Sequence, residues 1–220
     1  MAPRLVILGA GGHGAEVQTY VHDLSAEGWN GSLLGFLDDG LPPGQHLGLS
    51  VLGGIDEFVD RSPEFFADLF YLTAVGSNPA RRKLVERMDG LYRGRIRPWT
   101  LIHATVWKGA EVSIGDGTCV APGAIVTTRA RIGRHCILNV KASVSHDCVL
   151  GDYVNLNPGA TVCGNVTIGD GAYIGTGATL INKVSVGRNA IIGAGAVVVR
   201  DIPDSVTAVG VPARVIKRHG

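Results

Sequence analysis

The sequence has little net charge, no long hydrophobic run and no signal-peptide pattern, and each absence argues against a class of protein. Its 220 residues carry a formal net charge of +1, which does not indicate a nucleic-acid-binding surface. No stretch reaches the roughly 18 uninterrupted apolar residues of a membrane span, so we expect no membrane insertion. Residues 1–8 run directly into a glycine turn and lack the pattern of a secretory leader. We therefore expect a cytoplasmic protein without a nucleic-acid partner.

The cysteines form no C-x-x-C pair of the kind that binds zinc or carries out thiol redox chemistry. The four are Cys119, Cys136, Cys148 and Cys163. All lie within a repeating segment, where Cys136 and Cys148 hold a position that otherwise carries small residues. We expect reduced thiols with a structural role and neither a metal nor a redox function.

The repeating segment, residues 114–198, has a period of six. From Ile114 to Val198, all fifteen positions spaced six residues apart carry an aliphatic side chain. A helix repeats every 3.6 residues and a strand every 2, whereas a hexapeptide period is typical of a parallel β-helix. An aliphatic residue followed by glycine also recurs every eighteen residues, as at Ile132-Gly133 and Leu150-Gly151. The sequence therefore predicts triangular coils of three hexapeptides each.

The N-terminal part has a different pattern. The apolar run Leu5–Leu8 reads as a buried strand, and Gly9–Gly14 after it fits G-x-G-x-x-G. Glu16–Leu24 then has the periodicity of an amphipathic helix. Strand, glycine turn and helix together form a dinucleotide-type fingerprint, in which glycines let phosphates approach a helix N-terminus.

A second strand, Ser32–Leu37, ends at two acidic residues, Asp38 and Asp39. Carboxylates at this position can accept hydrogen bonds from a ribose or a base; the alternative is a tight turn with solvated carboxylates.

A further strand within Ala67–Val75, a helix over Arg81–Met88 and a strand at Gly94–Ile96 complete a series typical of a small parallel sheet. We predict an α/β domain over residues 1–97, resembling one half of a dinucleotide-binding fold, and an all-β parallel β-helix with a C-terminal cap over residues 98–220.

Polar residues are rare within the hexapeptides, and one group of them includes His146 and Asp147. A step of eighteen residues from His146 reaches Gly164, so the histidine is expected beside a residue without a side chain. A carboxylate next to a histidine favours the protonated imidazole, which suits a general base. The alternative is an exposed polar corner without catalytic function.

The whole chain resembles the sugar acyltransferases of the sialic acid O-acetyltransferase and bacillosamine-pathway N-acetyltransferase type. The matching stretches are Val6–Gly14, Gly35–Asp39, Ala74–Asn78, Leu101–His103, Ser145–Asp152 and Val209–Ile216. The resemblance implies a left-handed coil and acetyl transfer from acetyl-CoA to the amine of a nucleotide-linked sugar. We expect a UDP-linked 4-amino-4,6-dideoxy sugar first, and O-acetylation of a hydroxyl, such as that of a sialic acid, as the alternative.

The same resemblance assigns residues and partners. His146 would be the general base, Asp147 would orient it, and the Gly164 N–H would stabilise the oxyanion. The residues that would contact acetyl-CoA are Asn139, Asn155, Gly164, Ala194, Gly195, Arg214 and Lys217, with a solvated basic tail as the alternative for the last two. The residues that would hold the nucleotide are Gly12, His13, Gly14, Asp38 and Asp39. The family also implies a homotrimer with active sites between subunits.

Three further hypotheses use other features. The glycine turn could bind a nicotinamide cofactor in an oxidoreductase, although the domain lacks a second half. Zinc could be bound through His103, His135 and His146 in a hydratase; however, His135 and His146 are eleven residues apart, which does not match the coil repeat, and we expect no metal. The β-helix could also serve as a non-catalytic scaffold, which leaves His146-Asp147 and the glycine turn unexplained.

Overall fold

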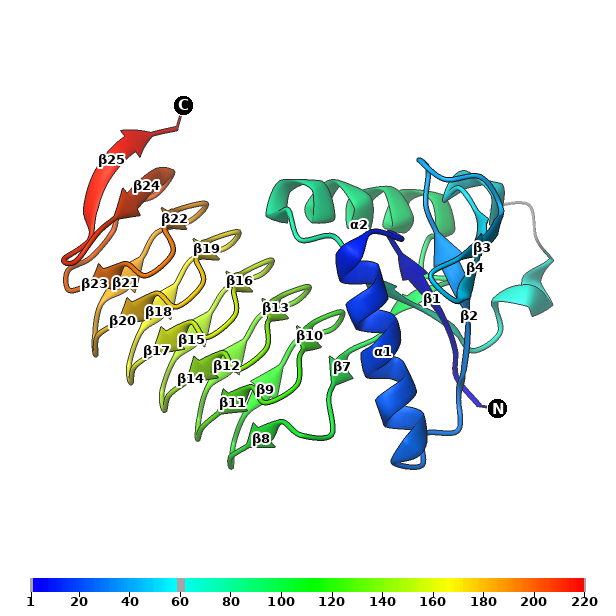
Figure 1. Ribbon diagram of the computed structural model, residues 1–220, viewed down its shortest axis with the longest axis horizontal. Helices are drawn as coiled ribbons and strands as arrows, with labels where there is room; N and C mark the ends of the chain where they lie inside the picture. Colours follow the sequence, from blue (N-terminus) through cyan, green and yellow to red (C-terminus); the bar gives the residue numbers. More distant parts are fainter. Residues whose placement is uncertain (1, 59–61, 220) are drawn as a thin grey trace. The chain divides into compact units, whose positions relative to one another are not determined.

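The computed structural model describes residues 2–58 and 62–219. The chain forms two compact units, residues 1–101 and 102–220, shown in Figure 1. The fold class predicted above is confirmed: an α/β unit precedes a left-handed parallel β-helix. Within the described ranges, none of the helices has the length and apolar character needed to span a bilayer.

The first unit is a six-stranded sheet in the order β3-β4-β2-β1-β5-β6. Its elements are β1 (Arg4–Leu8), α1 (Gly12–Ala26), β2 (Ser32–Leu37), β3 (Gly44–His46), β4 (Leu49–Gly53), two 3₁₀ turns (Asp56–Phe58 and Pro63–Phe66), β5 (Leu69–Thr73), α2 (Asn78–Tyr92) and β6 (Arg97–Pro98). All its strand pairs are parallel except β3 with β4. Residues Leu5–Leu8 of the central strand are fully buried, as expected for a parallel strand covered on both faces.

Both helices are longer than the sequence pattern predicted. Helix α1 begins at Gly12 rather than at Glu16. Helix α2 begins at Asn78, where the Ser77 side chain accepts a hydrogen bond from the Ala80 N–H. The predicted strand at Gly94–Ile96 is wrong, because the chain leaves α2 through residues with positive φ, and the last strand forms only at Arg97–Pro98.

The second unit is a stack of coils whose three sides are parallel sheets (Figure 1). One sheet contains β25 (Arg214–Arg218), β24 (Val206–Val209), β22 (Ile191–Ile192), β19 (Tyr173–Ile174), β16 (Asn155–Leu156), β13 (Ile137–Leu138), β10 (Cys119–Val120) and β7 (Leu101–Ile102). The next contains β23 (Val197–Val198), β20 (Thr179–Leu180), β17 (Thr161–Val162), β14 (Ser143–Val144), β11 (Ile125–Val126) and β8 (Trp107–Lys108). The third contains β21 (Ser185–Val186), β18 (Thr167–Ile168), β15 (Val149–Leu150), β12 (Arg131–Ile132) and β9 (Ser113–Ile114).

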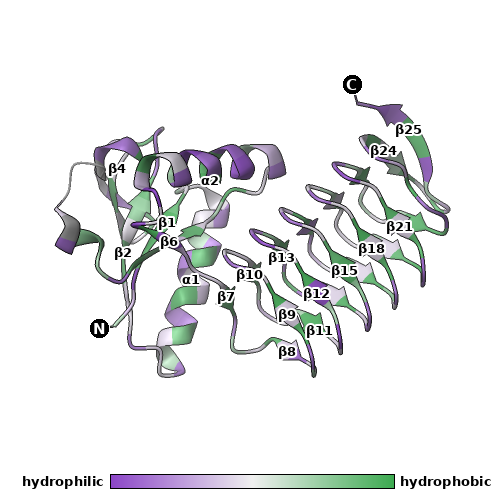
Figure 2. Cartoon of the chain, turned by 180° about the vertical axis from the view of Figure 1, so that it is seen from behind, coloured by the Kyte–Doolittle hydropathy of each residue, from purple (hydrophilic) through white to green (hydrophobic). Residues whose placement is uncertain are grey.

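From β9 to β23, the second residue of each strand points into the stack and belongs to its core, and most of the coil strands are hydrophobic in Figure 2. Val120, Leu138 and Leu156, for example, are fully buried and pair in register along one sheet. The C-terminal segment adds Val206, Ala208 and other side chains to this core, and β25 pairs antiparallel with β24. The last coil is therefore covered by the end of the chain.

One corner of the coils is a column of residues in the left-handed conformation, with φ between 57° and 65°. Its members, which we call the corner column, are Glu111, Arg129, Asp147, Asn165 and Lys183. Backbone hydrogen bonds tie each level to the one before, such as Asp147 N–H to Thr128 O (3.2 Å) and Asn165 N–H to His146 O (3.0 Å). The eighteen-residue repeat thus places residues far apart in sequence directly above one another.

Candidate active site

His146 and Asp147 lie in the turn between β14 and β15, at the corner column. The His146 Nδ1 atom is 2.7 Å from Asp147 Oδ2. The left-handed backbone at Asp147 (φ 59°) belongs to this turn. Neighbouring residues in a turn need not touch, but these two form a hydrogen-bonded pair, and the imidazole remains half exposed to solvent.

The hydrogen bond determines which nitrogen of His146 can act as a base. Hydrogen bonds from Arg129 and then from His146 lower the pKa of Asp147 from 3.8 to about 2, so the carboxylate is ionised and can only accept. Nδ1 of His146 must then carry the proton. Nε2 is left with its lone pair, which is the state a general base requires.

Arg129 is a residue of this site that the sequence analysis did not identify. Its Nε atom lies 2.7 Å from Asp147 Oδ1 and its Nη2 atom 3.0 Å from Asp147 Oδ2. The coil spacing of the sequence does contain this contact, because Arg129 precedes Asp147 by eighteen residues and therefore lies on the preceding coil. Reading the coil spacing from Asp147 as well as from His146 would have found it.

Gly164 lies on the coil after His146, directly against the imidazole ring. A Cβ atom built on Gly164 would be 2.6 Å from both Cε1 and Nε2 of His146, so only glycine leaves room for the imidazole in this position. Within the described residues, the Gly164 N–H has no hydrogen-bond partner. The site thus combines a proton acceptor with an unused backbone donor on the adjacent coil.

The remaining residues predicted for acetyl-CoA lie elsewhere on the second unit. Asn139 follows β13 and its Oδ1 accepts from the Val140 N–H (2.7 Å), while Asn155 is buried at the start of β16 in the same sheet. Ala194 and Gly195 are exposed in the turn after β22. The two basic residues, Arg214 and Lys217, are exposed on β25. The structure brings His146, Asp147 and Gly164 together and places these residues on other coils or sheets.

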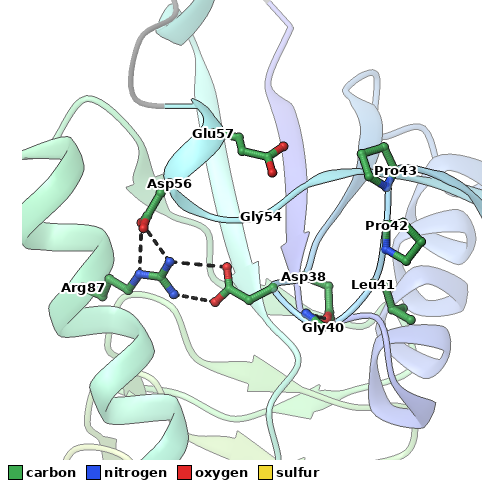
Figure 3. A pocket seen from close by; sticks show the side chains of 10 residues that line it. Asp38, Gly40, Leu41, Pro42, Pro43, Gly54, Asp56, Glu57 and Arg87 are labelled. Carbon is green, nitrogen blue, oxygen red and sulfur yellow. Dashed lines mark hydrogen bonds and ion pairs between the residues drawn. The ribbon is translucent and has the colours of Figure 1, made fainter.

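The first unit contains two adjoining cavities that share Asp38, Asp39 and Gly40. The larger, of about 410 Å³, is lined by Asp38, Asp39, Gly40, Leu41, Pro42, Pro43, Gly54, Asp56, Glu57 and Arg87 (Figure 3). The smaller, of about 270 Å³, also includes Gly9 and Val75. These residues follow β1, β2 and β5, so the cavities lie at the carboxyl ends of parallel strands, where open α/β sheets bind ligands.

The glycine turn presents the start of helix α1 beside these cavities. The N-cap residue is Gly11, which has no side chain to cap the first-turn N–H groups. Gly14 is buried, and a Cβ there would lie 2.4 Å from Gly9 O, so this glycine permits close packing of helix and strand. His13 Nδ1 lies 2.9 Å from Glu16 Oε2. Its Nε2 is buried and has no partner among the residues the structure describes.

The two predicted acidic residues each have partners in the protein. Asp38 accepts from the Ala10 and Gly40 N–H groups, both at 2.8 Å. Asp39 accepts from the Ile55 N–H at 3.0 Å and forms an ion pair with Arg87, whose hydrogen bond lowers the pKa of Asp39. The tight turn of the alternative considered above is present, because Asp38 accepts from the N–H two residues later, and the Asp39 side chain is 49% exposed despite its ion pair.

Arg87 is the second residue that the sequence analysis missed. It lies on α2 and also reaches Asp56, at 2.8 Å, as Figure 3 shows. It is 48 residues from Asp39, and no repeat connects the two positions. Only the packing of α2 beside the β2 turn brings them together.

Other chemistry has little support in the described residues. They contain no group of three or more histidine, cysteine or acidic side chains that could hold a metal ion. All four cysteines are free thiols, three of them buried. Burial raises the pKa of the Cys148 thiol, which keeps it protonated and unreactive.

Two family models match the chain: the PglD N-terminal domain over residues 4–88 and the bacterial transferase hexapeptide (six repeats) over residues 165–200. A GDP-perosamine N-acetyltransferase of Escherichia coli O157:H7 is 34% identical over 149 residues, which span 67% of this chain and 64% of that relative's length.

Two solved structures are similar over nearly the whole chain. The acetyltransferase domain of PglB from Neisseria gonorrhoeae FA1090, in complex with acetyl coenzyme A, is 34% identical with a TM-score of 0.87, covering 98% of this chain and 100% of that one. PerB from Caulobacter crescentus, in complex with CoA and GDP-perosamine, is 33% identical with a TM-score of 0.84, and the match covers 98% of each chain.

Proposed function

Because the chain belongs to the hexapeptide-repeat sugar acetyltransferases, we propose that it transfers the acetyl group of acetyl-CoA to the amino group of a nucleotide-linked amino sugar. The observation that carries the proposal is the His146–Asp147 pair beside Gly164, with an Nε2 lone pair facing away from the carboxylate. The family assignment leaves the oxidoreductase, zinc hydratase and scaffold hypotheses without support.

The proposed reaction is a direct attack on the thioester. The sugar nitrogen attacks as the neutral amine, and as it bonds to the carbonyl carbon it loses one proton, which His146 Nε2 accepts. The Gly164 N–H donates to the tetrahedral oxyanion. Collapse of this species breaks the carbon–sulfur bond, and the imidazolium returns its proton to the CoA thiolate. The products are an amide and free CoA, and no cysteine is required as an acyl carrier.

The first unit would bind the nucleotide. Gly12 and Gly14 lie at the uncapped start of α1, where a diphosphate can accept hydrogen bonds from the N–H groups of the helix. The unpartnered Nε2 of His13 offers a further polar contact, because buried ring nitrogens are normally hydrogen-bonded. Asp38 and Asp39 line the adjoining cavity, where their remaining lone pairs can accept from a base or ribose.

Two nucleotides are candidates for the acceptor sugar. We expect a UDP-linked 4-amino-4,6-dideoxy sugar on the bacillosamine-type resemblance. A GDP-linked 4-amino sugar is the second candidate, because two of the similar proteins carry GDP-perosamine in their names or titles. O-acetylation of a sugar hydroxyl remains the alternative reaction.

The coenzyme would run along the β-helix past Asn139, Asn155, Ala194 and Gly195, with its phosphates near Arg214 and Lys217. We further propose a cytoplasmic homotrimer whose active sites lie between subunits. Exposed aliphatic side chains on the outer face of the coils, including Ile125 and Val149 at 43% and 42% exposure, support such an assembly.

Release of CoA thiol tests the proposal. Native protein and a His146→Ala variant are assayed with acetyl-CoA and a panel of UDP- and GDP-linked 4-amino sugars and free sialic acid. We expect release with one amino sugar and its loss in the variant. Thiol release with sialic acid alone would replace N-acetylation by O-acetylation as the proposed reaction. If no substrate causes thiol release and the protein does not bind acetyl-CoA, the acetyltransferase function is refuted.

A further inference from the structure

Asp147 has two partners, and the second has no assigned role in the reaction. We propose that Arg129 is a positioning residue for the general base: it holds the Asp147 carboxylate in the orientation that His146 requires and offsets its charge. The inference rests on the proposed acetyl transfer, because it concerns the same histidine. Arg129 would not touch either substrate and would act through Asp147 alone.

The contacts of Asp147 divide between its two oxygens. Oδ1 accepts from Arg129 Nε at 2.7 Å, and Oδ2 accepts from both Arg129 Nη2 at 3.0 Å and His146 Nδ1 at 2.7 Å. A guanidinium that binds both oxygens of a carboxylate imposes a common plane on the two groups. The lone pair that Oδ2 directs at His146 is therefore set by the position of Arg129.

The imidazole needs this support because little else restrains it. The side chain of His146 is 49% exposed, and the carboxylate of Asp147 is 33% exposed. An exposed pair of this kind would otherwise rotate among several arrangements, and only one of them leaves Nε2 free beside Gly164. Because Arg129 and Asp147 occupy successive levels of the corner column, the rigid coils hold the two-point contact between guanidinium and carboxylate (the fork) in place.

Two variants test the two-point contact between Arg129 and Asp147. Arg129→Gln should lower kcat about tenfold, the magnitude expected for a lost charge-assisted hydrogen bond, with KM for both substrates unchanged. Arg129→Lys keeps the charge but cannot contact both carboxylate oxygens in one plane, so kcat should fall in this variant as well.

Arg134→Gln is the matched control. Arg134 also contacts an aspartate eighteen residues later, Asp152, through Nε at 3.3 Å and Nη2 at 3.2 Å. This pair is on the same β-helix but does not include His146. Its removal should leave kcat and the His146 tautomer at their native values, which would show that loss of an exposed arginine–aspartate pair is not itself the cause.

The proposal has a readout that does not require activity. In ¹H–¹⁵N spectra of the histidine rings, the neutral His146 of native protein should be protonated at Nδ1, whereas Arg129→Gln should show both tautomers. If the tautomer shifts but no panel sugar is acetylated, the proposed function fails and the positioning role stands. If Arg129→Gln keeps the native tautomer and the native kcat, the positioning role is refuted.

Discussion

Gly164→Ala is the substitution with the most directly calculable effect, because it adds one methyl group against the His146 ring. The new Cβ would be 2.6 Å from Cε1 and Nε2 of His146 and 3.2 Å from Cδ2. Carbon atoms in van der Waals contact are separated by about 3.5–4.0 Å. The imidazole must therefore move by about 1 Å, and a displacement of that size costs about 10²-fold in rate.

Stability should respond differently. Gly164 is not among the residues with positive φ, so alanine fits the backbone there. The His146 ring is half exposed and can swing into solvent. The exchange of glycine for alanine lowers the conformational entropy of the unfolded chain, which stabilises the folded protein by about 0.4–1 kcal/mol. We therefore expect a kcat about 10²-fold lower at an unchanged or slightly higher melting temperature. The backbone N–H of residue 164 is retained, so the change isolates the position of the histidine.

The assay is CoA-thiol release at saturating substrates, with Gly90→Ala as the control. Gly90 lies on α2, and a Cβ added there meets nothing within 4 Å, so its replacement should leave kcat unchanged. In a His146→Ala background, Gly164→Ala should have no further effect, because the ring that it displaces is gone. Native kcat for Gly164→Ala, or a full second loss in the double variant, would refute this account of the site.

Three further predictions concern the base, the cavity and the acid limit of stability. His146→Ala should lower kcat by about 10²–10⁴-fold, the range for a lost general base, and near-native turnover in a pure preparation would remove His146 from the mechanism. Arg87→Gln should raise KM for the nucleotide sugar about tenfold with little change in kcat, because Asp39 and Asp56 lose the cation that holds them at the cavity. Lys83→Gln, on the exposed face of the same helix, is the control. Equal KM values for the two variants would contradict the assignment of this cavity to the nucleotide. The pKa of Asp147 is lowered from 3.8 to about 2, so the stability it contributes should be complete above pH about 4 and disappear as the pH falls towards about 2. Thermal unfolding of native protein and Asp147→Asn over this range measures it, and a constant difference between the two would show that the carboxylate is not stabilised by its partners.

The β-helix could be predicted from the sequence because it follows a regular six-residue period, and the family could be predicted because its motifs are contiguous stretches. Every sixth residue from Ile114 onward faces the core, and the eighteen-residue register follows from three such steps per coil. That register also predicted that Gly164 would lie beside His146, which the structure confirms. The resemblance to sugar acetyltransferases is likewise confirmed by solved structures that match almost the full chain.

Contacts that depend on side-chain geometry were harder to predict from the sequence. The Arg129–Asp147 fork was implied by the register but requires knowing that the left-handed corner directs both side chains to the same place. The Arg87–Asp39 ion pair has no counterpart in any repeat, because it arises from the packing of α2 beside the turn after β2. The start of α1 was placed too late for a related reason: glycines weaken a helical pattern, yet here they lie in its first turn.

The nature of the product tests the central claim most directly. Native protein is incubated with acetyl-CoA and the nucleotide-linked 4-amino sugar that releases CoA thiol, and the product is analysed by mass spectrometry before and after mild alkaline treatment. The account predicts one added acetyl group that survives alkali, since an amide resists conditions that cleave an ester. An acetyl group lost in alkali would place the transfer on a hydroxyl and contradict the proposed attack by an amine.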